Sequence, residues 1–198
     1  VHAPANLNAW TNPAGGAWTT AANWSKGTVP TGADSAVIAA TGTYTVTLGQ
    51  GTTVGHLKVG GTSGTQTLNV TAGSMVVLGH DDITQRGSVT VQNGAVFNPR
   101  GHSEVTGSFA VNDGGRLWLT GGGSLDATHI LSPGSSVTGQ GTVQVEGTIL
   151  VDVRGAYDVD STLLDNGTLE FNGADTAFTQ RGRAFSLTTG GFLRGTGI

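Results

Sequence analysis

The side chains best suited to chemistry are two arginines, a tryptophan and two aspartates: Arg100, Arg116, Trp118, Asp158 and Asp160. A tryptophan ring can stack on the apolar face of a sugar, while guanidinium and carboxylate groups bond to its hydroxyls. These residues therefore predict a ligand-binding surface with saccharides as the ligand class. The alternative interpretation is an ordinary solvated face that carries one stray aromatic residue.

The two aspartates raise the separate possibility of catalysis. At positions i and i+2 of one strand, the Cα atoms of Asp158 and Asp160 would lie about 6.6–6.8 Å apart on the same side. That separation is near the range of inverting glycoside hydrolases. No histidine or third carboxylate is expected beside the pair, so we assign no catalytic residue and do not favour an enzyme. Calcium could bind the pair, although it needs six or more oxygen ligands; no other cofactor or metal site is predicted.

Two features of the histidines give further expectations. His80 and His102 are about one repeat apart, which predicts a shared polar corner rather than a metal site, since zinc needs three converging ligands. His129 falls in an inward column between Phe109 and Ile149. We favour a local bulge that turns Ile130 inward; if the register holds instead, Ile130 and Leu150 form an exposed apolar pair suited to a partner or to self-association.

The elements that position these residues follow from a repeat of about 20 residues. It is marked by Gly87, Gly107, Gly147 and Gly167, each followed by a hydroxyl residue and an apolar one. Two apolar columns share this period, and corner glycines recur in the same way. The columns are Val91, Val111, Leu131, Val151 and Phe171, and then Phe97, Leu117, Val137, Tyr157 and Ala177; the glycines are Gly94, Gly114 and Gly134.

Three short alternating stretches per repeat, separated by Gly and Asn, predict three strands per rung. The fold class is all-β: a single-stranded parallel β-helix (β-solenoid) whose rungs stack at about 4.8 Å. A meander of antiparallel hairpins would not keep one register over five copies. Two polar columns, the first at a corner just after a strand and the second on the outward side, predict ladders of hydrogen bonds between rungs. These columns are Gln92, Asn112, Ser132, Asp152 and Asn172, and Ser88, Ser108, Thr128, Thr148 and Thr168.

The two ends of the chain differ. Trp10, Trp18 and Trp24 lie in residues 1–36, which we expect to form an N-terminal Trp-rich cap over the solenoid; an aromatic platform for carbohydrate is the alternative. Residues 37–198 are expected to form the rungs. The pattern stops at Ile198 without a polar cap, which predicts that the solenoid continues in the parent protein and that the C-terminal rung can associate with another chain.

Composition limits the choice of partners. The 198 residues contain no cysteine, 34 glycines and only 11% charged residues, with a net charge of −4. With no basic cluster, nucleic acid and anionic membranes are poor partners. No apolar run approaches the roughly 20 residues that span a bilayer, so membrane insertion is not expected.

Several segments resemble bacterial secreted β-solenoids. Asn23-Trp24-Ser25, Val29-Pro30 and residues 43–48 look like their entry segment, and residues 164–169 and 190–197 are similar to passenger repeats of autotransporter adhesins. The resemblance implies secretion, display on the cell surface, and adhesion to host or matrix glycans or surface proteins. A structural or adhesive, non-catalytic segment is therefore the leading prediction. A glycan-binding module that uses the Trp118 face is the first alternative, and a polysaccharide hydrolase or lyase is the second.

Overall fold

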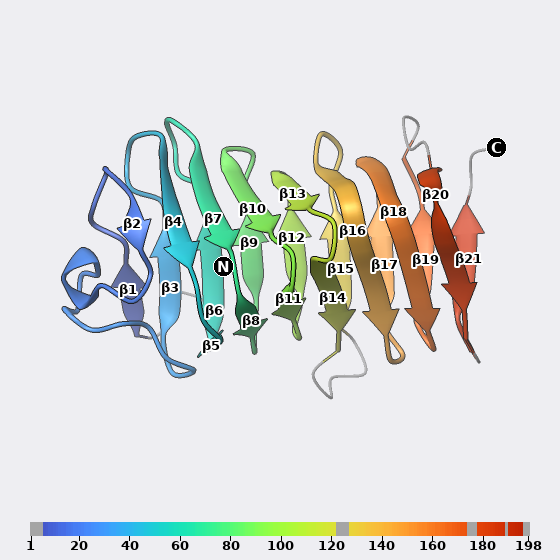
Figure 1. Cartoon of the computed structure of the whole chain (residues 1–198), viewed down its shortest axis with the longest axis horizontal. Helices are drawn as coiled ribbons and strands as arrows, with labels where there is room; N and C mark the ends of the chain where they lie inside the picture. Colours follow the sequence, from blue (N-terminus) through green and yellow to red (C-terminus); the bar gives the residue numbers. More distant parts are fainter. Residues whose placement is uncertain (1–5, 122–126, 174–177, 189, 196–198) are drawn as a thin grey trace.

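The chain forms a β-solenoid of about seven rungs, in which short strands stack in parallel along one axis (Figure 1). The computed structural model describes residues 6–121, 127–173, 178–188 and 190–195. All pairings between named strands in these residues are parallel, and the only helical residues among them are Ala21–Asn23. No described helix is long and apolar enough to cross a membrane.

Each rung contributes strands to three faces. The first face contains β2 (Gly16–Ala17), β4 (Tyr44–Leu48), β7 (Gln66–Val70), β10 (Gly87–Val91), β13 (Ser108–Val111) and the first halves of β16 (Ser136–Glu146), β18 (Ala156–Asp165) and β20 (Phe178–Leu187). The second face contains the other halves of these long strands with β5 (Thr52–Val54), β8 (Gly73–Val77), β11 (Ala95–Pro99) and β14 (Arg116–Thr120). The third face is a nine-stranded sheet: β1 (Leu7–Ala9), β3 (Ser35–Ile38), β6 (His56–Val59), β9 (Asp81–Ile83), β12 (Ser103–Val105), β15 (Thr128–Leu131), β17 (Leu150–Val153), β19 (Thr168–Phe171) and β21 (Phe192–Gly195).

Alternation along each strand places every second side chain in the core. One inward column of the third face is apolar over six rungs, and each of its members is at most 2% exposed. The members are Ile38, Val59, Ile83, Val105, Leu131 and Val153. Burial of such side chains contributes about 1.5–3 kcal/mol each. The predicted inward positions Val111 and Val151 are likewise fully buried.

The predicted corners and ladders exist in the first rungs. Gly94 and Gly114 both have φ of 72°, a left-handed conformation that glycine adopts without steric cost. At the same corner the Asn112 Nδ2 donates to Gln92 Oε1 over 2.7 Å. The Ser108 hydroxyl donates to that of Ser88 over 3.0 Å. Side chains at this corner and on the outer side of the first face therefore join consecutive rungs.

The prediction of one unbroken register is wrong at the connection from β14 on the second face to β15 on the third face, which we call the crossing. Phe109 pairs with Val89 on the preceding rung at the predicted spacing, but with Val137 on the next rung at a longer one. Leu131 therefore does not stack on Val111; it lies on the third face between Val105 and Val153. The longer connection moves the repeat onward by one face. Asp152 and Asn172, predicted to continue the ladder of Gln92, form a separate ladder on the third face.

The first and second faces also join differently in the later rungs. There a single long strand, β16, β18 or β20, bends through the corner instead of stopping at a turn. The register shifts at this bend, between Gly139 and Thr142 of β16 and between Val159 and Ser161 of β18. Such an irregularity changes which side chains point inward.

A cluster of three tryptophans lies at the N-terminal end of the stack. Trp10, Trp18 and Trp24 are at most 2% exposed, and the ring of Trp24 contacts the other two edge to face at 5.1 and 4.7 Å. The indole N–H of Trp24 donates to the Trp18 carbonyl over 2.7 Å. Backbone bonds join Trp10 to Val37 and Trp18 to Thr47, on the neighbouring rung. Because the rings are buried, they cannot serve as an exposed carbohydrate platform.

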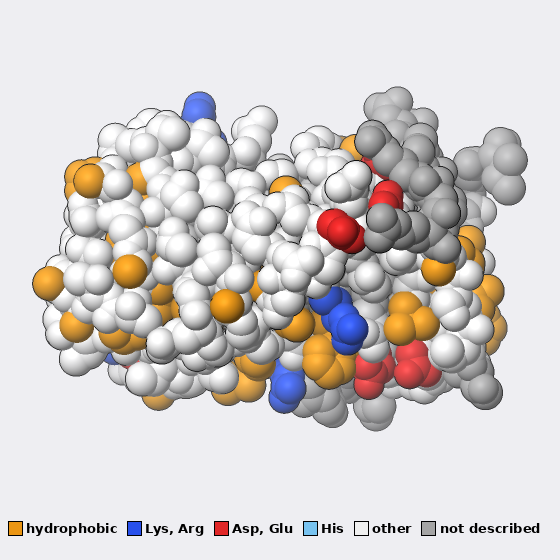
Figure 2. All heavy atoms as spheres, viewed as in Figure 1, with side chains coloured by type: hydrophobic (Ala, Val, Ile, Leu, Met, Phe, Trp, Pro, Cys, Tyr) orange, Lys and Arg blue, Asp and Glu red, His pale blue; other side chains and the backbone are white. Residues whose placement is uncertain are grey.

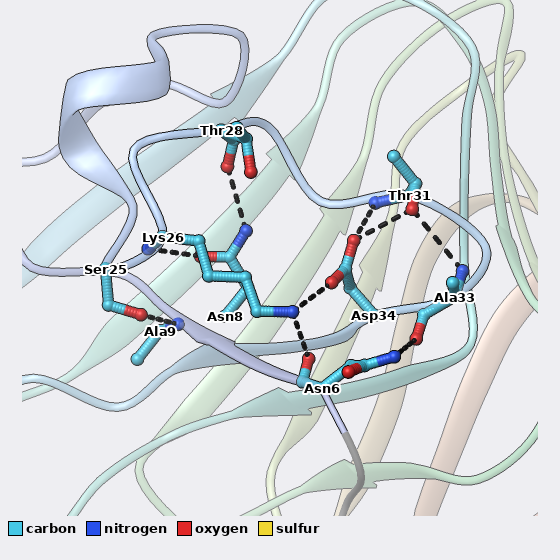
Figure 3. Close-up of polar contacts among 9 residues, drawn as sticks. All are labelled: Asn6, Asn8, Ala9, Ser25, Lys26, Thr28, Thr31, Ala33 and Asp34. Carbon is cyan, nitrogen blue, oxygen red and sulfur yellow. Dashed lines mark hydrogen bonds and ion pairs between the residues drawn. The ribbon is translucent and has the colours of Figure 1, made fainter.

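A polar network fastens the segment after the tryptophans to β1 (Figure 3). The Lys26 ammonium contacts Asp34 Oδ1 at 2.6 Å and the Asn6 carbonyl at 3.2 Å. The other Asp34 oxygen accepts from the Thr31 backbone and hydroxyl at 2.9 and 2.8 Å. The hydrogen bond from Lys26 is the main cause that lowers the pKa of Asp34, and the bonds from Thr31 add to it. The network therefore links the segment from Lys26 to Asp34 with the residues at the start of β1.

Candidate functional site

Trp118 lies on the outer side of the second face and leans over the adjacent rung. It pairs with Gln144 of β16. Its indole N–H donates to Glu146 Oε2 over 2.9 Å, and the Gln144 amide donates to the same oxygen over 2.8 Å. The side chain is half-buried. Both contacts fix the orientation of the ring, so a partner that stacks on it would not have to immobilise it.

Two arginines lie on the same face as Trp118. Arg116 is exposed and precedes Trp118 by two positions on the same side of β14. The Arg100 Nε donates to Asn98 Oδ1 over 2.9 Å, and the Asn98 amide donates to the Trp118 carbonyl over 2.6 Å. Asn98 itself is 1% exposed. The structure thus brings together three of the five predicted site residues, Arg100, Arg116 and Trp118.

The two aspartates of the predicted site lie elsewhere. Asp158 is half-buried on the first face, in register with Thr138. Asp160 is 8% exposed, because the register shift between Val159 and Ser161 turns it away from solvent. The expectation that both carboxylates point outward side by side is therefore wrong, and the separation expected for an inverting hydrolase loses its basis. Among the described residues, no group of three or more His, Asp or Glu side chains could hold a metal ion.

Sequence reasoning missed the polar partners of Trp118. Gln144 and Glu146 belong to a strand that pairs with β14 at a spacing longer than the repeat, which a search at the repeat period does not align. The sequence also did not single out Asn98, which is buried although it is a polar residue at an outward position of β11. The alternation of β11 gives no signal for this burial, which accompanies the hydrogen bond of Asn98 to the Trp118 carbonyl on the next rung.

The outer side of the third face has a shallow depression of about 480 Å³ that extends over its last four strands, β15, β17, β19 and β21. Phe192 is 54% exposed there, and the Arg194 guanidinium lies 5.6 Å from the centre of its ring. Its lining includes Thr128, Leu150, Thr168 and Glu170. Ile130 and Leu150 both lie on the outer side of this face, but they do not form the exposed pair that was expected: both are half-buried, and Ile130 pairs with Asp152 while Leu150 pairs with Thr128.

His129 is indeed inward, and the predicted bulge at this position is wrong. It is fully buried in register with Ser103, whose partner on the other side is Asp81. The Ser103 hydroxyl lies 2.6 Å from Asp81 Oδ1 and 2.6 Å from His129 Nδ1. Serine is therefore the middle member, whereas in a nucleophilic triad histidine is the middle member. The order and the burial of these residues exclude them from acting as such a triad.

The prediction for the other histidines is confirmed: His80 and His102 share a corner, with ring centres 5.1 Å apart. His56 adds a third member on the preceding rung, where its Nδ1 accepts from the His80 backbone over 3.0 Å. Burial is the main cause that lowers the pKa of His80, and the neighbouring His102 adds to it.

The fold and these surfaces define the chain as a β-solenoid repeat protein. Comparison with known proteins gives no matching family model, no matching curated protein and no matching solved structure.

Proposed function

We propose that this chain is a non-catalytic structural and adhesive segment of a protein that is secreted or displayed on a bacterial cell surface. The observation that supports it is the use of polar side chains as links between rungs. Asn69, Gln92 and Asn112 bond in sequence at one corner over 3.0 and 2.7 Å, and Ser88 bonds to Ser108. On the third face Asn172 bonds to Asp152 over 3.0 Å. Such ladders reinforce a long, narrow scaffold along its axis.

The outer surface is suited to display. Charged side chains gather on the C-terminal half of the face shown in Figure 2, whereas the N-terminal half carries few. A scaffold of this kind holds a binding patch at a fixed position, with little ordering cost when a partner binds. The proposed partners are glycans or surface proteins of a host or matrix, and the proposed location rests on the resemblance to secreted solenoids.

A second candidate function is saccharide binding at the Trp118 face. The observation that favours it is the fixed indole, tethered by Glu146, next to the exposed Arg116 and the anchored Arg100. Stacking on an aromatic ring combined with directed polar bonds is a general way to bind sugars. The same purified chain, assayed with and without calcium, also tests whether calcium takes part in binding.

Both proposals are tested by a glycan array and a matrix-protein panel probed with the purified chain, with and without calcium. We expect binding to one class of ligand and no cleavage of polysaccharide. Trp118→Ala should weaken glycan binding at least tenfold, whereas Thr90→Ala, on the outer side of the first face, should leave it unchanged. Polysaccharide cleavage that is lost in the Asp158→Asn, Asp160→Asn double variant would contradict the non-catalytic proposal. Binding that Trp118→Ala leaves intact would contradict the glycan site only.

A further inference from the structure

Three polar residues interrupt an otherwise apolar column inside the third face. Leu57, Asp81, Ser103, His129 and Val151 lie in register on consecutive rungs, and the three polar members are at most 1% exposed. The contacts of 2.6 Å on either side of the Ser103 hydroxyl join Asp81 to His129. The chain of contacts ends where His129 Nε2 lies 3.3 Å from a backbone carbonyl, that of Thr120.

The number of protons in this chain can be counted. The Thr120 carbonyl only accepts, so His129 Nε2 must carry a proton to bond to it. The Ser103 hydroxyl has one proton and lies between two atoms that can both accept. If Asp81 were ionised and His129 carried only its Nε2 proton, one contact would bring two lone pairs together at 2.6 Å. One additional proton satisfies both contacts of the Ser103 hydroxyl, although Asp81 Oδ2 is buried without a hydrogen-bond partner among the described residues.

We propose that Asp81, Ser103 and His129 hold this additional proton as a shared, fully buried chain. With the proton on Asp81, the carboxylic acid donates to Ser103 Oγ, Ser103 donates to His129 Nδ1, and Nε2–H donates to the Thr120 carbonyl. If one proton moves from Asp81 to Ser103 while another moves from Ser103 to His129, the result is a carboxylate and an imidazolium. Both forms contain the same atoms and the same total charge.

The surroundings favour the uncharged form. Burial raises the pKa of Asp81 to about 7, against the opposing effect of the Ser103 hydrogen bond. Burial also lowers the pKa of His129 to about 4, against the opposing effect of the bond to Thr120. The column neighbours Leu57 and Val151 bring no charge. The nearby strands and corners carry five other titratable or charged groups: Lys58, His80, Asp82, His102 and Glu104. Of these, Asp82 raises the pKa of Asp81, and His102 lowers the pKa of His129.

The consequence is a core whose proton count does not change on folding over a wide pH range. In the unfolded chain between about pH 4 and 6.5, Asp81 is ionised and His129 is protonated, so the pair holds one proton. The folded chain also holds one, on Asp81. Folding then neither takes up nor releases a proton at this pair, and the pair adds no pH dependence to stability in that window.

Single substitutions in this pair should make the folding stability depend on pH, with opposite signs for Asp81 and His129. In His129→Gln, Asp81 keeps a raised pKa, so its contribution to stability is complete below about pH 4 and is lost as the pH rises towards 7. In Asp81→Asn, His129 keeps a lowered pKa, so its contribution is complete above about pH 6.5 and is lost as the pH falls towards 4. Val105→Ala, in the neighbouring apolar column, is the control and should weaken the fold equally at every pH.

The experiment measures the unfolding equilibrium with denaturant between pH 4.5 and 6.5. As the pH increases, the folding constant relative to that of the unsubstituted chain should rise about tenfold per pH unit in Asp81→Asn. In His129→Gln it should fall about tenfold per pH unit. Parallel pH profiles for the unsubstituted chain and both variants would overturn the proposal. If a variant does not fold, infrared spectra of the unsubstituted chain labelled with 13C-aspartate decide. One protonated carboxylic acid at pH 6, together with neutral His129 protonated at Nε2, is expected; ionised aspartates together with a neutral His129 would overturn the proposal.

Discussion

The rungs before residue 121 and those after residue 127 join the first face to the second face in two different ways. In the earlier rungs, separate strands on the first and second faces meet at turns, such as those containing Gly94 and Gly114. In the later rungs, β16, β18 and β20 run through the corner and the register shifts there in β16 and β18. The spacing of repeats is similar in both parts. The difference teaches that a sequence period determines how often strands recur, whereas connection lengths determine the face on which each strand lies.

The crossing between these two parts produces the features of greatest interest. Its longer connection pairs β14 with β16, which brings Glu146 to Trp118. It also pairs β12 with β15 in the register that brings His129 to Ser103. A spacing held strictly at the repeat period would have made neither contact.

The largest expected effect comes from charge in the core of either part. Val111→Asp before the crossing and Val151→Asp after it each place an unpaired carboxylate in a column that is fully buried. We expect a loss of more than about 4 kcal/mol and global unfolding, because burial of an unpaired charge is among the most destabilising changes. Far-UV circular dichroism with thermal melting measures it. If either variant melts only part of the β signal, the two parts fold as separate units; an unchanged melting temperature would contradict the assigned columns.

A smaller effect is expected at the N-terminal end of the first part. Trp24→Ala removes a side chain that is 2% exposed, its ring contacts and its hydrogen bond to Trp18. The expected loss is about 3–5 kcal/mol. Trp24→Phe is the matched variant and should lose less, because a ring still fills the site. Equal stability of Trp24→Ala and the unsubstituted chain in denaturant titrations would show that this cluster does not support the first rung.

The smallest effect is expected in the network around Asp34, and it depends on pH. The pKa of Asp34 is lowered in the folded chain, so its contribution to stability is present above the ordinary pKa of about 3.9 and is lost as the pH falls through the lower folded value. Asp34→Asn should cost about 1–3 kcal/mol at pH 7. The difference between the two proteins should shrink in melts below pH 4. A difference that stays constant from pH 7 to pH 2 would rule out the Lys26 contact as its cause.

The sequence predicted a parallel solenoid because alternation and corner glycines are local properties. Residues such as Val111 and Gly94 could be assigned from their neighbours alone. The position of Asp160 could not, because it depends on a register shift inside a continuous strand. His129 could not be assigned either, because its stabilising partner Ser103 lies across the longer connection. The Trp118 face was predicted in part, from residue types, but without the polar groups that hold the ring.

The register across the crossing is the central claim, and pairs of spin labels test it most directly. The chain contains no cysteine, so labels can be attached at two introduced cysteines without removing any native one. Ala110 and Thr138 are register partners across the longer connection, both half-buried on the outer side of the first face. Neighbouring strands lie about 4.8 Å apart, so labels at these positions should show strong dipolar broadening. Labels at Ala110 and Ile130, which are one repeat period apart in the sequence, should show little, because Ile130 lies on the third face. Strong broadening for the second pair and weak broadening for the first would contradict the account.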